Sequence, residues 1–262
     1  MSGSTRRNAL PIILLILAVE GIFFLPFVIP RVFRPTVLNY FIITNLELGA
    51  YFSLYGVVAL LSYVAGGWLA DRFESRNLMA GALTLTASGG FAVAFWPNST
   101  ILPFVYGFWG FTTIFLFWAA MLRATRVWGG NSFQGRAFGF LESGRGFVSA
   151  LIALAAVLIF SGEHMGEVDF RSVVIFTSVV VLAIGLLVLF LFPSNSREVD
   201  SEKIEILKGF KILLKNPELW KLSLIVLCAY VGYKTTDDIS LFANDVLGFN
   251  EAEAAGLATA AL

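Results

Sequence analysis

Ionisable side chains inside long apolar segments are the residues of this chain whose types and positions point to chemistry. Glu20 lies near the middle of one such segment, and Lys234, Asp237 and Asp238 lie toward the end of another. A charged group in the interior of a bilayer has a high free energy, so such groups usually face a cavity and bind a substrate or a proton. Asp237 follows Lys234 by three residues on the same helix face, which favours an ion pair. Glu20 and an anionic group of a solute are the other candidate partners of Lys234.

The elements that must position these groups are membrane-spanning helices. Apolar residues make up 58% of the 262 residues and charged residues only 14%, with a mean hydropathy of +0.81. A soluble domain has about 25% charged residues. A span needs about 20 mostly apolar residues. The sequence therefore predicts an all-α membrane protein with spans at 9–30, 48–70, 78–96, 101–122, 137–160, 171–192 and 220–242, and with an eighth helix that begins near Asn250.

The distribution of Lys and Arg predicts the orientation of these spans. Most basic residues fall in segments on the same side as the N-terminus, and only Arg31, Arg34 and Arg171 fall in segments on the other side. Positively charged loops stay in the cytoplasm during insertion. We therefore expect a cytoplasmic N-terminus.

A charged island joins the second and third predicted spans. It reads Gly67-Trp-Leu-Ala-Asp71-Arg72-Phe-Glu74-Ser-Arg76, of the form G-x-L-A-D-R-x-x-x-R. This pattern resembles the signature loop between helices 2 and 3 of the major facilitator superfamily of secondary transporters. Glu74 departs from it, because the family usually has Gly there.

The residue types in this island have a physical role as well. Gly66 and Gly67 are expected to permit close approach of a neighbouring helix. Asp71 is expected to accept hydrogen bonds from the start of the next helix and to pair with Arg72 or Arg76. The family resemblance adds that the cluster of Gly67, Asp71, Arg72 and Arg76 is a gating loop, which bridges to the opposite half of the transporter.

The resemblance also implies a domain plan of two six-helix bundles. Residues 1–193 would form the first bundle, 194–219 an amphipathic cytoplasmic linker, and 220–262 the truncated start of the second bundle. In that plan the first and seventh spans are equivalent and line a central cavity. This placement makes Glu20, Lys234, Asp237 and Asp238 candidate substrate-binding or proton-binding residues. We expect the chain to be a fragment of a protein that is monomeric at full length.

A second charged cluster is expected at the inner face, with Arg123 and Arg136 beside the pair Glu142 and Arg145. Glu142 and Arg145 are three residues apart on one helix face. The run Q-G-R-x-F-G-x-x-E-x-x-R-G is similar to bacterial permeases of the YihN type, distant relatives of the organophosphate:phosphate antiporters. That similarity implies the bacterial inner membrane. A clamp between spans and a direct role in transport are both open for the cluster.

Several expected features of related transporters are absent from the sequence. The organophosphate antiporters carry one phosphate-binding arginine on the first span and one on the seventh, whereas here Arg31 lies a turn too far out and only Lys234 substitutes. A phosphate ester is therefore a doubtful substrate. The drug:proton antiporters carry an arginine near the start of the fourth span and a proline in the fifth span, and this sequence has neither. Four rings are candidates for stacking on a sugar-like solute, with packing as the alternative: Tyr51, Tyr55, Trp109 and Trp118.

The sequence thus predicts a permease, symporter or antiporter, that works by alternating access. It would carry a small polar or anionic organic solute, with proton coupling through Glu20. No enzyme, ATP-binding or nucleic-acid-binding pattern is present, and we expect no metal and no cofactor. The partners we expect are the lipid bilayer, the solute and a proton. A truncated, non-transporting scaffold or receptor-like remnant is the alternative.

Overall fold

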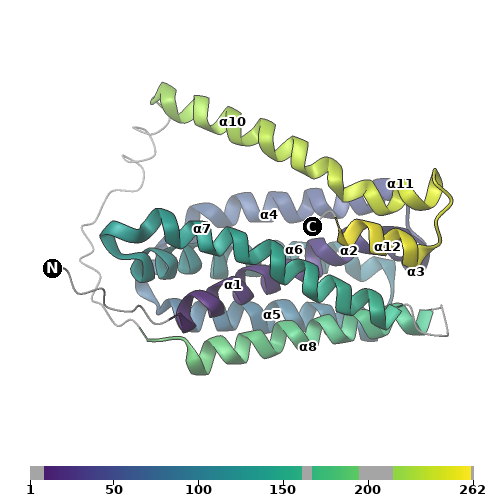
Figure 1. Ribbon diagram of the computed structural model, residues 1–262, viewed down its shortest axis with the longest axis horizontal. Helices are drawn as coiled ribbons and strands as arrows, with labels where there is room; N and C mark the ends of the chain where they lie inside the picture. Colours follow the sequence, from purple (N-terminus) through teal and green to yellow (C-terminus); the bar gives the residue numbers. More distant parts are fainter. Residues whose placement is uncertain (1–8, 161–166, 195–214, 261–262) are drawn as a thin grey trace.

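The computed structural model describes residues 9–160, 167–194 and 215–260 (Figure 1), and it describes only the backbone of Val64, Ala65, Asn131 and 167–169. Within these ranges every regular element is a helix. The predicted all-α membrane fold is therefore confirmed.

Six described helical stretches are long and apolar enough to cross a membrane, at Leu10–Val32, Asn45–Tyr63, Ser75–Phe95, Ser99–Gly130, Ser132–Phe160 and Phe170–Leu191. They match the first six predicted spans. The helices that form them are α1 (Leu10–Phe23), η1 (Phe24–Val28), α2 (Ile29–Val32), α4 (Asn45–Arg72), α5 (Ser75–Phe95), η2 (Ser99–Ile101), α6 (Leu102–Phe111), η3 (Thr112–Trp118), α7 (Ala119–Phe160) and α8 (Glu167–Leu191). Helix α3 (Arg34–Phe41) links the first span to the second.

Local sequence signals account for the helix ends. Thr44 and Glu47 form a reciprocal capping box at the start of α4, in which each side chain accepts from the other residue's backbone N–H. Helix α7 contains the turn between the fourth and fifth spans, where Gly130 has a φ of 58°. Glycine adopts that left-handed conformation without a steric penalty, so the chain reverses there.

Two spans change their helical period near the middle of the bundle. Segment η1 in the first span and η3 in the fourth are π-helical. Pro26 lies within η1 and Pro30 lies just after it, and a proline leaves a backbone carbonyl without its usual donor. A π-helical turn adds one residue to the period, and such turns are frequent at functional sites. These segments therefore change which side chains of the two spans face the bundle axis.

The helices pack in pairs, one antiparallel (α5 with α8) and two parallel (α4 with α6, α1 with α7), that are joined by small residues and hydroxyl groups. Helix α5 lies along α8, α4 along α6, and α1 along α7. At Gly110 a side chain has no room, because a Cβ there would lie 2.6 Å from the carbonyl oxygen of Tyr55. Buried hydroxyl pairs add direct links, with Tyr55 Oη 2.6 Å from Thr113 Oγ1 and Thr86 Oγ1 2.8 Å from Thr112 Oγ1. Close backbones and interhelical hydrogen bonds are what hold helices together in lipid.

The chain continues past the linker into α10 (Pro217–Lys234), η4 (Thr235–Asp238), α11 (Ile239–Asp245) and α12 (Glu251–Thr259). The predicted seventh span is helical, and the predicted eighth helix begins at Glu251, directly after its cap Asn250. Most of the predicted amphipathic linker, at 195–214, lies outside the described residues. Helix α10 has no buried residue, whereas α12 buries Ala254, Ala255 and Ala258.

Two ends of the bundle need names for the description of the site. The Glu74 end holds the turn between α4 and α5, and the Asn45 end holds α3 and the start of α4. Helices α11 and α12 pack against α2 and α3 at the Asn45 end, whereas α10 runs apart from the bundle toward the Glu74 end (Figure 1).

Candidate functional site

A cavity of about 720 Å³ lies between α10 and the bundle. Its walls come from the first, second, fourth and fifth spans and from α10. Both π-helical segments contribute, η1 through Phe27 and Val28 and η3 through Ile114 and Trp118. Five charged residues line it: Glu20, Arg31, Glu142, Arg145 and Lys234. A volume of this size suits a small organic ligand.

The first charged group of the cavity, here called the Arg145 cluster, consists of Glu20, Glu142 and Arg145. Arg145 Nη1 lies 2.9 Å from Glu142 Oε2, and Arg145 Nε lies 3.5 Å from Glu20 Oε2. Glu20 is buried on α1, with 8% of its side chain exposed, whereas 62% of the Glu142 side chain is exposed. Ser149, one turn after Arg145 on α7, lines the same cavity. The cluster therefore joins the first and fifth spans across the cavity wall.

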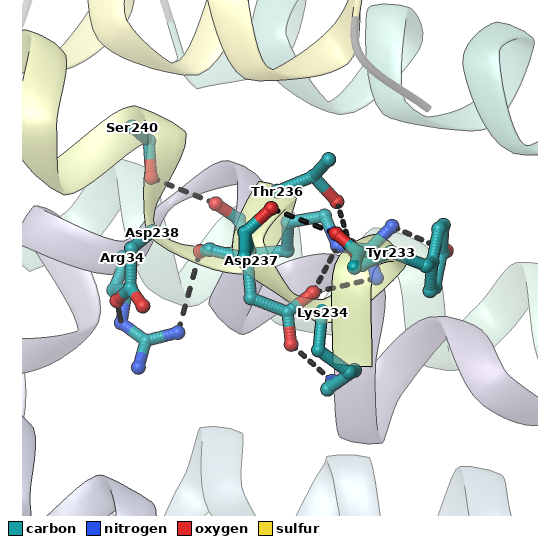
Figure 2. Close-up of polar contacts among 10 residues, drawn as sticks. Arg34, Tyr233, Lys234, Thr236, Asp237, Asp238 and Ser240 are labelled. Carbon is teal, nitrogen blue, oxygen red and sulfur yellow. Dashed lines mark hydrogen bonds and ion pairs between the residues drawn. The ribbon is translucent and has the colours of Figure 1, made fainter. Parts of the chain in front are cut away.

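The second group, here called the Asp237 cluster, consists of Arg31, Tyr233, Lys234 and Asp237. Arg31 Nε and Nη2 lie 2.7 Å and 2.6 Å from the same oxygen, Asp237 Oδ1, and Arg31 Nη1 donates to the Tyr233 hydroxyl at 2.7 Å. Lys234 pairs with the other oxygen, Asp237 Oδ2. The Asp237 carboxylate is thus shared between a basic residue of the first span and one of α10 (Figure 2).

Further contacts hold η4 and α12 to the Asn45 end of the bundle. Arg34 Nε lies 3.1 Å from Asp238 Oδ1, and the Ser240 hydroxyl donates to the Arg31 carbonyl at 2.7 Å. Figure 2 shows Arg34, Asp238 and Ser240 around the short 3₁₀ turn of η4. Glu251 at the start of α12 accepts from Thr36 at 2.5 Å. These contacts hold η4, α11 and α12 against the first span and α3 at the Asn45 end.

The two clusters have opposite net charges. With ordinary ionisation the Asp237 cluster has two cations, Arg31 and Lys234, for one carboxylate, and the Arg145 cluster has two carboxylates for one cation. The cavity therefore presents one excess positive charge near the Asn45 end and one excess negative charge deeper in the bundle. Each cluster can therefore attract one further charge of the opposite sign.

The structure brings together the intramembrane residues that the sequence singled out, with one pairing decided between alternatives. Glu20 and Lys234 line one cavity, yet Glu20 pairs with Arg145 and Lys234 pairs with Asp237. Asp238 has 55% of its side chain exposed and lies on the outside of η4. The ion pair expected from the three-residue spacing of Lys234 and Asp237 is confirmed.

The predicted role of Asp71 as a helix cap is wrong. Helix α4 continues through Asp71 to Arg72, so the residue that precedes α5 is Glu74. In the described part of the chain Asp71 has no ion pair. Arg76 Nη2 lies 3.5 Å from Glu74 Oε2, and the Arg72 guanidinium stacks over the Trp68 ring at 4.0 Å.

The expectation for the two glycines before this turn is half correct. A Cβ at Gly66 would lie 3.0 Å from the carbonyl oxygen of Phe115, so Gly66 does permit close approach of the fourth span. Gly67 instead has open space around it. It lies one residue, about 100° around the helix, from the packed face.

The four residues of the predicted inner-face cluster do not form one group. Arg123 on α7 donates to the Ala70 carbonyl at 2.5 Å, which ties the fourth span to the end of the second. Arg136 lies over the Phe133 ring at 5.5 Å. The Glu142–Arg145 pair forms as expected, but Arg145 also reaches Glu20 and lines the cavity.

Sequence reasoning missed Arg31 and Tyr233 as cavity residues. Arg31 was expected to lie a turn too far out, but it is only 5% exposed and lines the same cavity as Glu20. The prolines around η1 were the signal that the first span does not follow a regular helical period to its end. Of the four candidate stacking rings, Tyr55 and Trp118 line the cavity. Trp109 is buried, and its ring N–H donates to the Thr86 carbonyl at 3.0 Å.

A helical membrane bundle that encloses a cavity lined by paired charges is the architecture of a membrane transport protein. Comparison with known protein families agrees with this class. The chain belongs to the Major Facilitator Superfamily, whose family model matches residues 7–262. It is an integral membrane protein of that family, and the predicted resemblance is confirmed.

Three curated proteins are similar to the chain. Inner membrane protein YihN of Escherichia coli K12 is 27% identical over 203 residues, covering 74% of this chain and 48% of YihN. Inner membrane protein YqcE of the same organism is 26% identical over 196 residues, 72% of this chain and 46% of YqcE. The uncharacterized protein MG294 homolog of Mycoplasma pneumoniae is 28% identical over 255 residues, 86% of this chain and 53% of that protein. The chain spans about half the length of these relatives.

Proposed function

We propose that this chain forms the proton-sensing and solute-binding half of a secondary transporter for a small organic anion. The observation that carries the proposal is the pair of oppositely charged clusters on the walls of one cavity. The Asp237 cluster is the site for the anionic group of the solute, since it has one positive charge in excess. The Arg145 cluster is the site for the proton, since it has one negative charge in excess.

Charge balance couples the two sites. A monoanion at the Asp237 cluster neutralises that cluster, and a proton on Glu20 neutralises the Arg145 cluster. We assign the proton to Glu20 rather than to Glu142, because Glu20 is buried inside the bundle beside Arg145 and Glu142 is mostly exposed. With both ligands bound, neither cluster carries a net charge through the low-dielectric interior during the conformational change. The expected result is symport of the anion with one proton, or exchange of two anions.

The sidedness of the proposal follows the distribution of basic residues. The Glu74 end, with Arg72, Arg76 and Arg123, would face the cytoplasm, with the N-terminus on that side. The cavity then opens toward the cytoplasm, between α10 and the bundle, and is closed at the Asn45 end by the contacts of η4 and α12. Alternating access requires these contacts to break when the cavity opens to the other side.

The loop at the Glu74 end would form the second gate. Gly67, Asp71 and Arg72 are exposed, so they are free to contact a helix of a second bundle. Asp71 does not cap α5, so its carboxylate is available for such a contact. Arg76, held by Glu74, and Arg123, held by Ala70, would position the loop.

Substitution of Glu20 tests the proton site. In proteoliposomes of the full-length protein, Glu20→Gln should abolish accumulation driven by a pH gradient and should leave counterflow exchange of the anion intact. The solute for this assay is found first, by thermal stabilisation of the full-length protein with sugars, sugar acids, carboxylates and phosphate esters at pH 6 and pH 8.

Glu218→Gln is the matched control, because it removes an equal charge at an exposed side chain of α10 that does not line the cavity. It should keep pH-driven accumulation. Equal loss of accumulation and exchange in Glu20→Gln, or equal effects of the two variants, would contradict the proton-coupling role.

A further inference from the structure

Aromatic rings form a continuous wall on the bundle side of the cavity. The rings of Trp118 and Phe23 meet edge to face at a centroid distance of 5.9 Å, Phe23 and Phe27 lie 6.2 Å apart, and Phe27 and Tyr55 lie 4.7 Å apart. All four residues line the cavity. They come from the first, second and fourth spans, so the wall is assembled by tertiary packing.

A second pair of rings faces this wall from α10. Tyr230 and Tyr233 line the cavity, with centroids 6.1 Å apart. Both rings are about half exposed, and Phe23, Phe27 and Trp118 are partly exposed as well. Large apolar surface left open in a cavity is the usual sign of a surface that a ligand covers.

The π-helical segments supply two of the rings in this wall. Phe27 lies within η1 and Trp118 is the last residue of η3. Both segments depart from the regular α-helical period at the point where they contribute a ring to the cavity. Strained or irregular helical turns persist where the surrounding structure requires them.

The cationic groups lie directly beside these rings. Lys234 Nζ is 5.3 Å from the centroid of Phe27, and the guanidinium carbon of Arg31 is 4.8 Å from the centroid of Tyr233. An anionic group bound by Lys234 or Arg31 would therefore be next to a ring face. The part of the solute attached to that anionic group would therefore contact the aromatic wall directly. A long chain between the anionic group and the part that stacks on the rings would not fit.

We propose that the solute is a cyclic organic acid, with its acidic group attached on or next to a six-membered ring that stacks against the Phe23–Phe27–Trp118 wall. Ring faces, whether of a sugar acid or of a carbocyclic acid, offer the flat C–H surface that aromatic side chains bind. An open-chain acid of equal charge cannot present that surface in one rigid piece and loses more conformational freedom on binding. This inference rests on the proposed function, because it takes the Asp237 cluster as the anion site.

Two matched pairs of probes test the proposal on the full-length protein. Glucuronate, a pyranose acid, is compared with gluconate, its open-chain counterpart, and cyclohexanecarboxylate is compared with heptanoate. The shift of the thermal unfolding midpoint with concentration gives an apparent Kd for each. The ring member of at least one pair should bind roughly 10-fold more tightly than its chain counterpart. The pair that shows the preference identifies the ring as a sugar or a carbocycle.

Two wall variants locate the preference. Trp118→Leu and Phe27→Leu keep an apolar side chain and remove the ring face, so each should reduce the ring-to-chain preference by roughly 2- to 10-fold. Trp96→Leu is the matched control, because Trp96 is 66% exposed after the end of α5 and does not line the cavity. It should leave the preference unchanged.

The outcomes separate this inference from the proposed function. Tight binding of acids without any preference for rings overturns the cyclic-acid proposal and leaves the anion site standing. Unchanged preference in both wall variants overturns it as well. If no acid of either shape binds, the proposed function fails together with it.

Discussion

Replacement of Asp237 by asparagine tests how the cavity is closed at the Asn45 end. Asp237 Oδ1 accepts two N–H groups of Arg31, from Nε at 2.7 Å and from Nη2 at 2.6 Å, and only 6% of the Arg31 side chain and 11% of the Asp237 side chain are exposed. The Lys234 contact lies within the α10–η4 segment, so it does not hold that segment to the bundle. Arg31 therefore supplies the part of the interaction that opening must break.

The size of the effect follows from these two bonds. A hydrogen bond to a charged group contributes about 1.5–3 kcal/mol and a neutral one about 1 kcal/mol. An amide in place of the carboxylate should thus weaken each Arg31 bond by about 1 kcal/mol, or about 2 kcal/mol in total. That corresponds to about a 30-fold shift from the closed toward the open arrangement of the Asn45 end.

Asp238→Asn is the matched control. It also removes a carboxylate that pairs with an arginine of the bundle, but 55% of the Asp238 side chain is exposed. Exposed pairs contribute about 0.5 kcal/mol, so the expected shift is about 2-fold, and it should shrink further at high salt.

Cysteine labelling measures the shift. Ser240 is fully buried, and its hydroxyl bonds to the Arg31 carbonyl, so Ser240→Cys in a background with Cys228→Ser reports opening at this end. The rate of maleimide labelling of the full-length protein should rise about 30-fold with Asp237→Asn and about 2-fold with Asp238→Asn. Equal rates for the two variants, or no change in either, would refute the assignment of closure to the Arg31–Asp237 contact.

Two further predictions concern the stability of the bundle, measured by thermal unfolding of the full-length protein in detergent. Gly110→Ala should destabilise it by about 1–3 kcal/mol, because the new Cβ would meet the Tyr55 carbonyl, whereas Gly107→Ala, whose nearest neighbour is 3.9 Å away, should have little effect. Thr44→Ala should cost about 1 kcal/mol by removing the capping box of α4, and Ser53→Ala, an exposed position in the same helix, should not. Equal losses within either pair would contradict the packing or the capping argument.

The sequence determined the features that depend on short stretches of chain. Hydropathy and length identify the six spans, because each span must be apolar over about 20 residues whatever its neighbours are. The G-x-L-A-D-R-x-x-x-R island and the Q-G-R run identified the family, because both are contiguous. The ion pairs Lys234–Asp237 and Glu142–Arg145 were also within reach, since helical spacing alone sets them.

Only the tertiary structure decided which of these residues meet. Glu20 pairs with Arg145 of the fifth span, and Arg31 pairs with Asp237 of η4, across sequence separations that no helical period describes. Arg31 was not predicted to be a site residue, because a regular helix would place it one turn too far out. The π-helical η1 lies between Glu20 and Arg31, and a change of period there rotates every later side chain of the span.

The same reason explains the rings and the signature loop. Trp109 and Trp118 look equivalent in the sequence, but Trp109 precedes η3 and Trp118 is its last residue, and one ring is buried while the other faces the cavity. Asp71 looked like a cap because the sequence does not show that α4 continues past it. A sequence fixes composition along a helix, whereas the direction in which each side chain points depends on where the period changes and on which neighbour packs against it.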